Sequence, residues 1–511
     1  MSEQWIPGPP TENYWDACPD FRALCKRKLS EGAFAWAEPQ LSAMGEQSAK
    51  IVAPLAAIAD VEQPRLVTHN ARGERLSRVD YHSSYREMER IAYGSGMIAM
   101  KYQTHEHSRE APFVGFALGY MFAMAECGLY CPLCMTDGVA RVLTRHGTPE
   151  QVARVVPHLT STDPSTLWTG GMWLTERAGG SDVGANETMA TKDSDGTWRL
   201  SGHKWFCSNV DAQAVLVTAR ANGGEGTKGL RTFLLETRDN PGVIIERLKP
   251  KLGVRSMATG EVTLVDARAE EVGGFAAMAD MLNLSRLYNA VASVALISRA
   301  VLESRHYIER RHAFGRPIIE FPLAQETFFD MEAEHVGAML LTFEAVDALV
   351  RADAGDEDAA KMLRILTPIV KAVTGKLAVP CVSEAMELIG GNGYIEESPM
   401  PRLLRDAQVL PIWEGTTNIL VLDALRVMHR DSSQELLLSR IRKQFPREAD
   451  ALAYTFANLD ESDARCWIDR LARLLELTLL LEAGHGEYAD RLKDRPLGML
   501  PGARSFEGTR P

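Results

Sequence analysis

Cysteine is scarce in this chain, and its spacing excludes the common cysteine-based frameworks. Eight cysteines are spread over 511 residues, and only Cys131 and Cys134 stand at CxxC spacing. No second CxxC pair and no histidine pair follows at the spacing of a zinc site, so the sequence predicts no metal site. Apolar neighbours such as Leu129 and Leu133 predict that both thiols are buried. The lack of a disulfide framework fits a reducing compartment.

Targeting signals and long apolar runs are also missing. Residues 1–7 lack the charged and apolar regions of a signal peptide. No apolar run looks long enough to span a bilayer. We therefore expect a soluble, cytoplasmic protein with no membrane partner.

Positive charge is outnumbered in the chain. Lysine and arginine total 56 against 68 acidic residues, which gives a formal net charge of −12 and a pI near 5.6. Residues 431–511 hold acids and bases in near balance. Binding of nucleic acid needs a basic surface, so the composition argues against such a partner and leaves only a local basic patch open. No GxGxxG motif follows a strand at a helix start, and a Rossmann site is therefore not indicated.

The hydrophobic periodicity divides the chain into five regions. Residues 83–164 have helical spacing, 165–272 contain short β-rich segments between turns, and 273–430 contain long helical patterns with short connections. We predict an α+β protein with an N-terminal helical domain, a middle β-barrel or sandwich and a C-terminal four-helix bundle. Residues 1–82 form an N-terminal extension, and 431–511 form a helical C-terminal extension. The expected strands are 167–175, 198–202, 214–219, 231–236, 243–248 and 261–266, and the expected bundle helices are 278–311, 323–352, 359–390 and 418–429.

The main chemical signal is the segment Pro-Ile-Trp-Glu-Gly-Thr-Thr-Asn at residues 411–418. Glu414 stands between an aromatic residue and a glycine, just before a helical pattern. The dipole at the start of a helix would stabilise its anion. In an apolar pocket the pKa of the carboxyl would instead rise toward the range of a general base. A surface loop followed by an ordinary helix start is the alternative interpretation.

Three neighbouring motifs carry a resemblance to a known family. They are Gly-Gly-Asn-Gly-Tyr at 390–394, Arg-Leu-Leu-Arg-Asp-Ala at 402–407, and Trp-Glu-Gly-Thr-Thr-Asn at 413–418. Together they resemble the acyl-CoA dehydrogenase family of FAD enzymes. The long N-terminal arm resembles the AidB-like branch of that family. The resemblance implies FAD as the cofactor and Glu414 as the base that removes the α-proton of an acyl-CoA thioester.

The resemblance also implies which residues contact the cofactor. In the segment 174–182, Thr175 and Ser181 match positions that bind the flavin, and backbone N–H groups in such a turn suit anionic or carbonyl oxygens. In the segment 202–209, Phe206 takes the place of the family's tryptophan and Ser208 that of its threonine. A guanidinium suits the pyrophosphate, which the family's arginine reaches across a subunit interface. The further implied contacts are Arg311, Phe314, Gly390, Gly391, Trp413, Thr416 and Asn418.

The implied contacts with substrate are Ser181, Arg286 and Gly415. Arg286 matches an arginine of the family's substrate-side helix. The chain departs from the family pattern at several of these places. Arg177 replaces a proline of the first flavin motif, Asn283 replaces an aspartate, and Glu387 replaces a glutamine before the glycines.

We therefore predict an FAD-dependent acyl-CoA dehydrogenase-like oxidoreductase of fatty acid metabolism. Glu414 takes the α-proton of the thioester and a hydride passes to flavin N5. The predicted partners are acyl-CoA or a related thioester, further copies of the chain in a homotetramer or dimer, and an electron-transfer flavoprotein. Two alternatives stay open: an AidB-like flavoprotein with a DNA-binding, protective role and weak dehydrogenase activity, and a flavin acyl-CoA oxidase. Nitroalkane oxidases, which have the same fold, carry aspartate at the position of Glu414 and are disfavoured.

Overall fold

The computed structural model describes residues 7–221 and 224–495. The outer ends of the two predicted extensions, residues 1–6 and 496–511, lie outside the described residues. The chain divides into two compact units. We call them the β unit, which comprises Val52–Gly115 and Glu126–Tyr288, and the helical unit, which comprises 7–51, Phe116–Ala125 and 289–495. Helices α6 (Ala111–Ala123) and α9 (Phe275–Arg310) run from one unit into the other.

Over its described residues, the β unit combines a seven-stranded sheet and a two-stranded sheet with four helices that lie wholly within it. The helices are α4 (Ala53–Val61), α5 (Ser83–Gly94), α7 (Cys127–His146) and α8 (Pro149–Leu159), and the strands are β1 (Arg65–His69), β2 (Arg75–Asp80), β3 (Gly170–Trp173), β4 (Met189–Lys192), β5 (Trp198–Ser208), β6 (Ala214–Arg220), β7 (Leu230–Glu236), β8 (Val243–Leu248) and β9 (Thr259–Gly274). Helix α8 begins with a capping box, in which Thr148 and Gln151 satisfy each other's backbone N–H groups.

Five strands of the β unit close on themselves. The strand β6 pairs with β7, β7 with β9, β9 with β5 and β5 with β4, and β4 meets β6 again at the pair Met189 and Arg220. The strand β3 pairs in parallel with residues 214–217 of β6, and β8 pairs with β9. Side chains from several strands, among them Trp173, Leu200 and Phe233, fill the core. This closed arrangement matches the expected small barrel.

Two parts of the β structure differ from the expectation. Residues 65–80 form the hairpin β1–β2, where the sequence indicated only a turn. The strand β2 has one buried residue, Val79, so its hydrophobic alternation is too weak to reveal a strand. The strand β9 runs over 16 residues, well past the predicted end at Asp266. The buried positions at the start of its second half are Ala267 and Ala269, and alanine is depleted in strands, so little in the sequence indicates a strand there.

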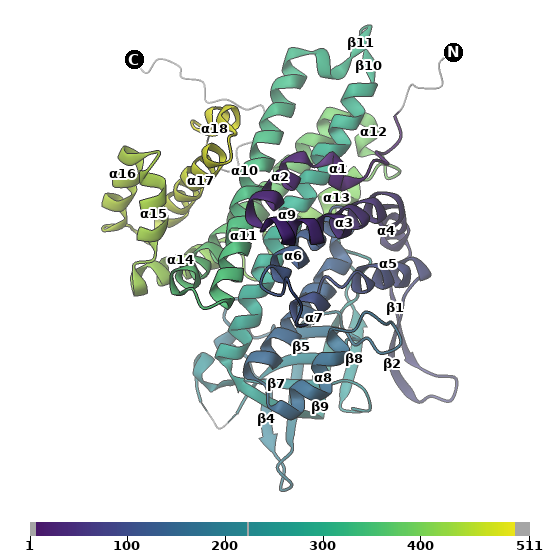
Figure 1. Cartoon of the computed structure of the whole chain (residues 1–511). Helices are drawn as coiled ribbons and strands as arrows, with labels where there is room; N and C mark the ends of the chain where they lie inside the picture. Colours follow the sequence, from purple (N-terminus) through teal and green to yellow (C-terminus); the bar gives the residue numbers. More distant parts are fainter. Residues whose placement is uncertain (1–6, 222–223, 496–511) are drawn as a thin grey trace. The chain divides into compact units, whose positions relative to one another are not determined.

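The helical unit contains the predicted bundle. Its helices are α1 (Tyr14–Ala17), α2 (Pro19–Lys28), α3 (Glu31–Gln47), α10 (Pro322–Asp353), α11 (Glu357–Ile389), α12 (Gly391–Tyr394), α13 (Met400–Ala407), α14 (Thr417–Asp431), α15 (Gln434–Arg442), α16 (Pro446–Phe456), α17 (Ala464–Glu482) and α18 (Gly486–Leu492), with the short strands β10 (His312–Ala313) and β11 (Arg316–Pro317). The long helices α10 and α11 run side by side (Figure 1). Asp356 caps the start of α11, and Gly390 ends it with a φ of 74°.

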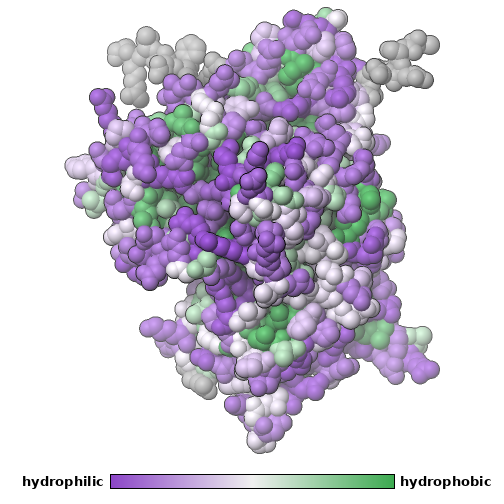
Figure 2. All heavy atoms as spheres, in the orientation of Figure 1, coloured by the Kyte–Doolittle hydropathy of each residue, from purple (hydrophilic) through white to green (hydrophobic). Residues whose placement is uncertain are grey.

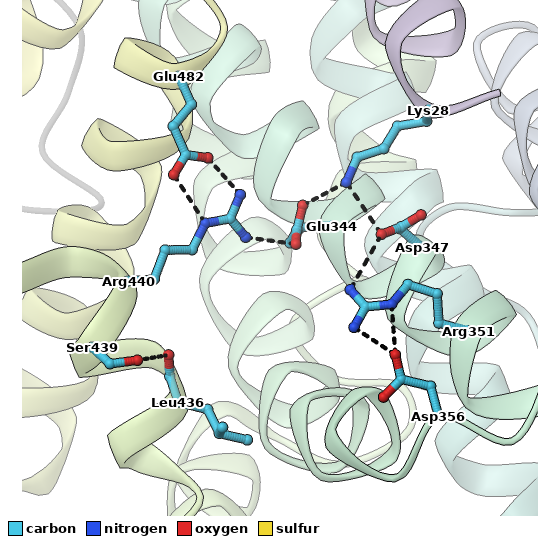
Figure 3. Close-up of polar contacts among 9 residues, drawn as sticks. All are labelled: Lys28, Glu344, Asp347, Arg351, Asp356, Leu436, Ser439, Arg440 and Glu482. Atoms are coloured by element: carbon cyan, nitrogen blue, oxygen red, sulfur yellow. Dashed lines mark hydrogen bonds and ion pairs between the residues drawn. The ribbon is translucent and has the colours of Figure 1, made fainter. Parts of the chain in front are cut away.

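A charge network joins α2, α15 and α17 to α10 (Figure 3). Lys28 of α2 lies 2.8 Å from Glu344 of α10, and Arg440 of α15 lies 2.6 Å from the other oxygen of the same carboxylate. Arg440 also pairs with Glu482 of α17. Burial raises the pKa of Glu344, but the two cations outweigh burial and hold it below its usual value. Glu344 therefore links an N-terminal helix to the C-terminal extension.

The carboxyl group of Glu476 on α17 makes stability depend on pH. Burial, helped by nearby negative charge and opposed by Arg473, raises its pKa to about 8 from 4.5. The folded state then holds a proton that the unfolded state has released, so stability falls as pH rises through about 8. We expect the free energy of unfolding to drop more between about pH 5 and about pH 9 in the unchanged protein than in Glu476→Gln. An equal change of the free energy of unfolding with pH in both proteins would contradict this prediction. Glu461→Gln, a change at an exposed position, is the control.

One helix and one thiol differ from the simple sequence expectations. Within residues 7–221 and 224–495, α11 alone is long and apolar enough to cross a membrane by length and composition, whereas the sequence suggested no such run. Of its most apolar window, 83% is buried, which fits a core helix. Cys131 is only half-buried, whereas Cys134 is buried as predicted. The visible surface is mostly hydrophilic, with separate small hydrophobic patches (Figure 2).

Candidate functional site

Two of the predicted flavin motifs lie side by side in the β unit. The first follows the end of β3, and the second forms the last half of β5. The backbone N–H of Trp205 donates to the carbonyl oxygen of Thr175 at 2.9 Å, which joins the two segments directly. Thr175 and Ser208 are half-buried, and Ser181 is exposed. The structure thus brings the hydroxyl-bearing segments together at one end of the barrel strands.

A buried ion pair supports this junction. The Lys204 ammonium lies 2.6 Å from Glu176 Oε1 and donates to the Thr218 carbonyl at 2.7 Å. Glu176 Oε2 accepts from the backbone N–H groups of Glu187 and Thr188. Burial lowers the pKa of Lys204, and the Glu176 charge offsets it only in part. Because both charged groups are satisfied, the pair fixes the loop that follows β3.

The aromatic residue of the second motif is open to solvent. The Phe206 side chain is 55% exposed. The Lys249 ammonium lies 3.5 Å from the ring centroid of the neighbouring Trp205 and 4.8 Å from that of Phe206. Arg177, which stands where the family has proline, lies 4.6 Å over the same indole. The arginine at the family's proline position therefore adds a cation–π contact that joins the first motif to the second.

Arg286 lies in the part of α9 that belongs to the β unit. Its Nη1 donates to Asn283 Oδ1 at 3.2 Å, one helical turn away. The asparagine that replaces the family's aspartate thus still contacts the arginine, as a neutral partner.

His203, a strand residue beside the second motif, bonds Thr263 across β5 and β9 at 3.0 Å, which fits an ordinary strand position.

Glu414 lies in a turn of the helical unit just before α14. Its φ is 57° and that of Gly415 is 105°, so both are in the left-handed region. Glutamate is uncommon there, and such conformations cluster at functional sites. The Glu414 side chain is half-buried, with Oε2 shielded from solvent. Thr416 is the N-cap of α14, so the carboxylate precedes the helix start closely, as the sequence predicted.

The remaining predicted cofactor residues of the helical unit are largely exposed. Gly390 and Gly391 separate α11 from α12, and Trp413 is half-buried in the Glu414 turn. Phe314 is 98% exposed at the tip of the β10–β11 hairpin, with a φ of 51°. Arg311 is half-buried at the base of that hairpin, and Asn418 is exposed at the start of α14. Glu387 is exposed near the end of α11.

A cavity of about 710 Å³ opens beyond the end of β5 in the β unit. Its lining includes Asn209, Asp211, Tyr81 and Arg86. The Tyr81 hydroxyl donates to Asp211 at 2.8 Å, and Arg86 lies between Asp211 and Glu89. These polar groups pair with one another. Over the part of the chain that the structure describes, no group of three or more His, Cys, Asp or Glu could hold a metal ion.

Comparison with known proteins decides the family. Family models match as the AidB N-terminal domain over 9–164, the acyl-CoA dehydrogenase middle domain over 171–267 and its C-terminal domain over 273–429. The chain is 38% identical over 439 residues to acyl-CoA dehydrogenase family member 11 of Caenorhabditis elegans, covering 82% of this chain and 71% of that protein. The chain belongs to the acyl-CoA dehydrogenase family.

Further relatives place this family member among the AidB-like proteins. AidB of Escherichia coli (strain K12) is 34% identical over 431 residues, covering 82% of this chain and 79% of AidB. The crystal structure of Caenorhabditis elegans ACDH-11 in complex with C11-CoA has a TM-score of 0.89 at 33% identity, covering 99% of this chain and 94% of that chain. These findings confirm the predicted family and fold. The family is typically FAD-dependent.

Sequence reasoning missed the two buried lysines next to the motifs. Lys204 stands within the second motif, and it is 1% exposed and holds Glu176. Lys371 of α11 is 0% exposed and donates to the carbonyl oxygen of Gly415 at 2.6 Å. A signal for Lys371 exists in the sequence, because it interrupts an otherwise apolar helical run between Ile369 and Val373.

Proposed function

We propose that this family member is an FAD-dependent dehydrogenase that forms a double bond between the α and β carbons of an acyl thioester. The observation that carries the proposal is Glu414: a half-buried carboxylate on a left-handed backbone, within a segment that matches the family's base motif. A backbone held in that region is strained, and such strain is kept where it serves function.

The residues of the flavin motifs fit FAD. Phe206 presents an exposed aromatic side chain for the flavin ring, and the neighbouring segment carries the hydroxyl groups of Thr175 and Ser181. The residues that would hold the cofactor are Thr175, Ser181, Phe206, Ser208, Arg311, Phe314, Gly390, Gly391, Trp413, Thr416 and Asn418. Bound FAD would supply the hydride acceptor for the reaction.

The chain's own residues perform the proton step. The Glu414 carboxylate takes the α-proton of the thioester. The backbone N–H of Glu414 donates to the thioester carbonyl oxygen and so stabilises the charge that develops there. Ser181, Arg286 and Gly415 are the proposed substrate contacts. The crystal structure of the relative ACDH-11 with C11-CoA supports an acyl-CoA as the substrate class.

Exposed apolar side chains support assembly with further copies of the chain. Phe314, Leu323 and Tyr394 of the helical unit are 98%, 84% and 78% exposed. Surfaces that meet a partner carry exposed apolar side chains. We propose a homo-oligomer, a tetramer or a dimer, with an electron-transfer flavoprotein as the electron acceptor.

Anaerobic titration of the purified protein with acyl-CoA thioesters of graded chain length tests the function. We expect a yellow protein whose visible flavin absorbance is lost on addition of at least one thioester. A colourless protein that takes up no FAD would reject the proposal, as would a flavoprotein that no thioester reduces. Stoichiometric release of peroxide in air would instead favour the oxidase alternative.

A further inference from the structure

One face of α11 holds the Glu414 turn at two points. Lys371 and Gly375 are four residues apart, so they lie on the same side of the helix. At Gly375 the passing chain comes so close that a Cβ atom would lie 3.0 Å from the Leu410 carbonyl oxygen and 3.3 Å from the Pro411 nitrogen. At Lys371 the ammonium donates to the Gly415 carbonyl at 2.6 Å. Glu414 lies between these two anchor points in the chain.

Local hydrogen bonds close the Glu414 turn on its N-terminal side. The backbone N–H groups of Ile412 and Trp413 donate to the Val409 carbonyl, which closes the turn before Glu414. Thr416 then begins α14 without a side-chain cap. A glutamate at a φ of 57° pays a steric cost that neither element removes. The Lys371 bond to the next carbonyl is a contact from outside the turn that favours this conformation.

Lys371 is costly to keep in this position. It is 0% exposed within a helix whose neighbouring residues, such as Val370 and Ala372, are buried and apolar. Burial of an ammonium without good hydrogen bonds is strongly unfavourable, so its bond to Gly415 is strong and geometrically demanding. Packing alone would be served better by methionine or leucine of similar volume.

We propose that Lys371 is a positioning residue for the reaction: its bond to the Gly415 carbonyl keeps the Glu414 backbone left-handed and thereby sets the direction of the carboxylate. This inference rests on the proposed function of Glu414. Loss of the bond lets the turn relax, and the carboxylate moves away from its working direction. Displacement of a reacting group by about 1 Å lowers rates by about 100-fold.

The test compares Lys371→Met and Lys371→Gln with Lys376→Met, at an exposed lysine on the same helix. Stopped-flow flavin reduction by the best acyl-CoA gives a limiting rate and a thioester Kd. We expect Lys371→Met to keep its FAD content and its Kd while the limiting rate falls about 100-fold. Lys371→Gln can still donate a hydrogen bond to the Gly415 carbonyl, so its limiting rate should fall less than that of Lys371→Met. Lys376→Met should match the unchanged protein.

A second measurement does not depend on activity. Hydrogen–deuterium exchange of residues 409–417 should become faster in Lys371→Met and stay unchanged in Lys376→Met. Unchanged exchange and an unchanged limiting rate would overturn the proposal. Loss of FAD and of cooperative melting in both Lys371 variants would also overturn it, by assigning the lysine to core stability alone. A flavoprotein that no thioester reduces would reject the proposed function. If hydrogen–deuterium exchange of the turn were still faster in Lys371→Met, Lys371 would nevertheless stabilise the turn.

Discussion

Glu414→Gln should leave FAD bound and slow the reduction of the flavin by an acyl thioester about 100- to 10,000-fold. Glutamine has the same shape as glutamate but cannot accept the α-proton. The Oε2 atom of Glu414 is shielded from solvent, so bulk water does not readily take over the proton transfer. The measurement is anaerobic stopped-flow absorbance at saturating thioester, with FAD content determined on the same samples.

Glu397→Gln is the matched control for this variant. Glu397 is an exposed glutamate of the helical unit, outside the 411–418 segment. Its replacement removes the same charge and should leave the reduction rate within about twofold, as expected for a solvated surface site. A Glu414→Gln protein that is reduced at the unchanged rate would show that another group takes the proton.

Arg473→Met should lower the free energy of unfolding by about 3–5 kcal/mol, because it leaves the buried Glu334 carboxylate without its cation. The Arg473 side chain is 1% exposed. Its Nη2 donates to both oxygens of Glu334 on α10, at 2.8 and 2.9 Å, and its Nη1 donates to Glu476 at 2.9 Å. Through these bonds Arg473 joins α17 of the C-terminal extension to the bundle. Calorimetry and denaturant unfolding measure the loss.

Two further variants separate this cluster from a general effect of charge removal. Arg470→Met removes an exposed arginine of the same helix and should change stability by less than about 1 kcal/mol. Replacement of Arg473, Glu334 and Glu476 together by apolar residues of similar volume should recover most of the loss, since no buried charge then remains. Equal destabilisation by Arg470→Met and Arg473→Met would contradict the role of the buried cluster.

The bundle helices were predictable because their apolar periodicity is long and regular. Residues 418–429 were expected to be helical, and α14 spans Thr417–Asp431. Short exposed strands were not predictable in the same way. The strand β4 contributes a single buried residue, Ala190, so nothing in its sequence distinguishes it from a loop.

The candidate site likewise contains residues that the sequence identified and supporting residues that it did not. Motif residues such as Glu414, Thr175 and Phe206 were identifiable because their residue types and order resemble a family pattern. The supporting charges were not identifiable, because lysine and glutamate are usually exposed and a motif carries no sign of burial. The roles of Lys204 and Lys371 emerge only from the distances of 2.6 Å that join them to Glu176 and to the Gly415 carbonyl.

The sequence by itself determined the family, the order of helical and β regions and the identity of the candidate base, because periodicity and local motifs are properties of neighbouring residues. The tertiary structure decided what holds those residues in place. Closure of the barrel, the junction between Thr175 and Trp205, and the bond from α11 to the Glu414 turn join segments far apart in the chain. Such contacts depend on which buried groups meet, and that is fixed only when the chain packs.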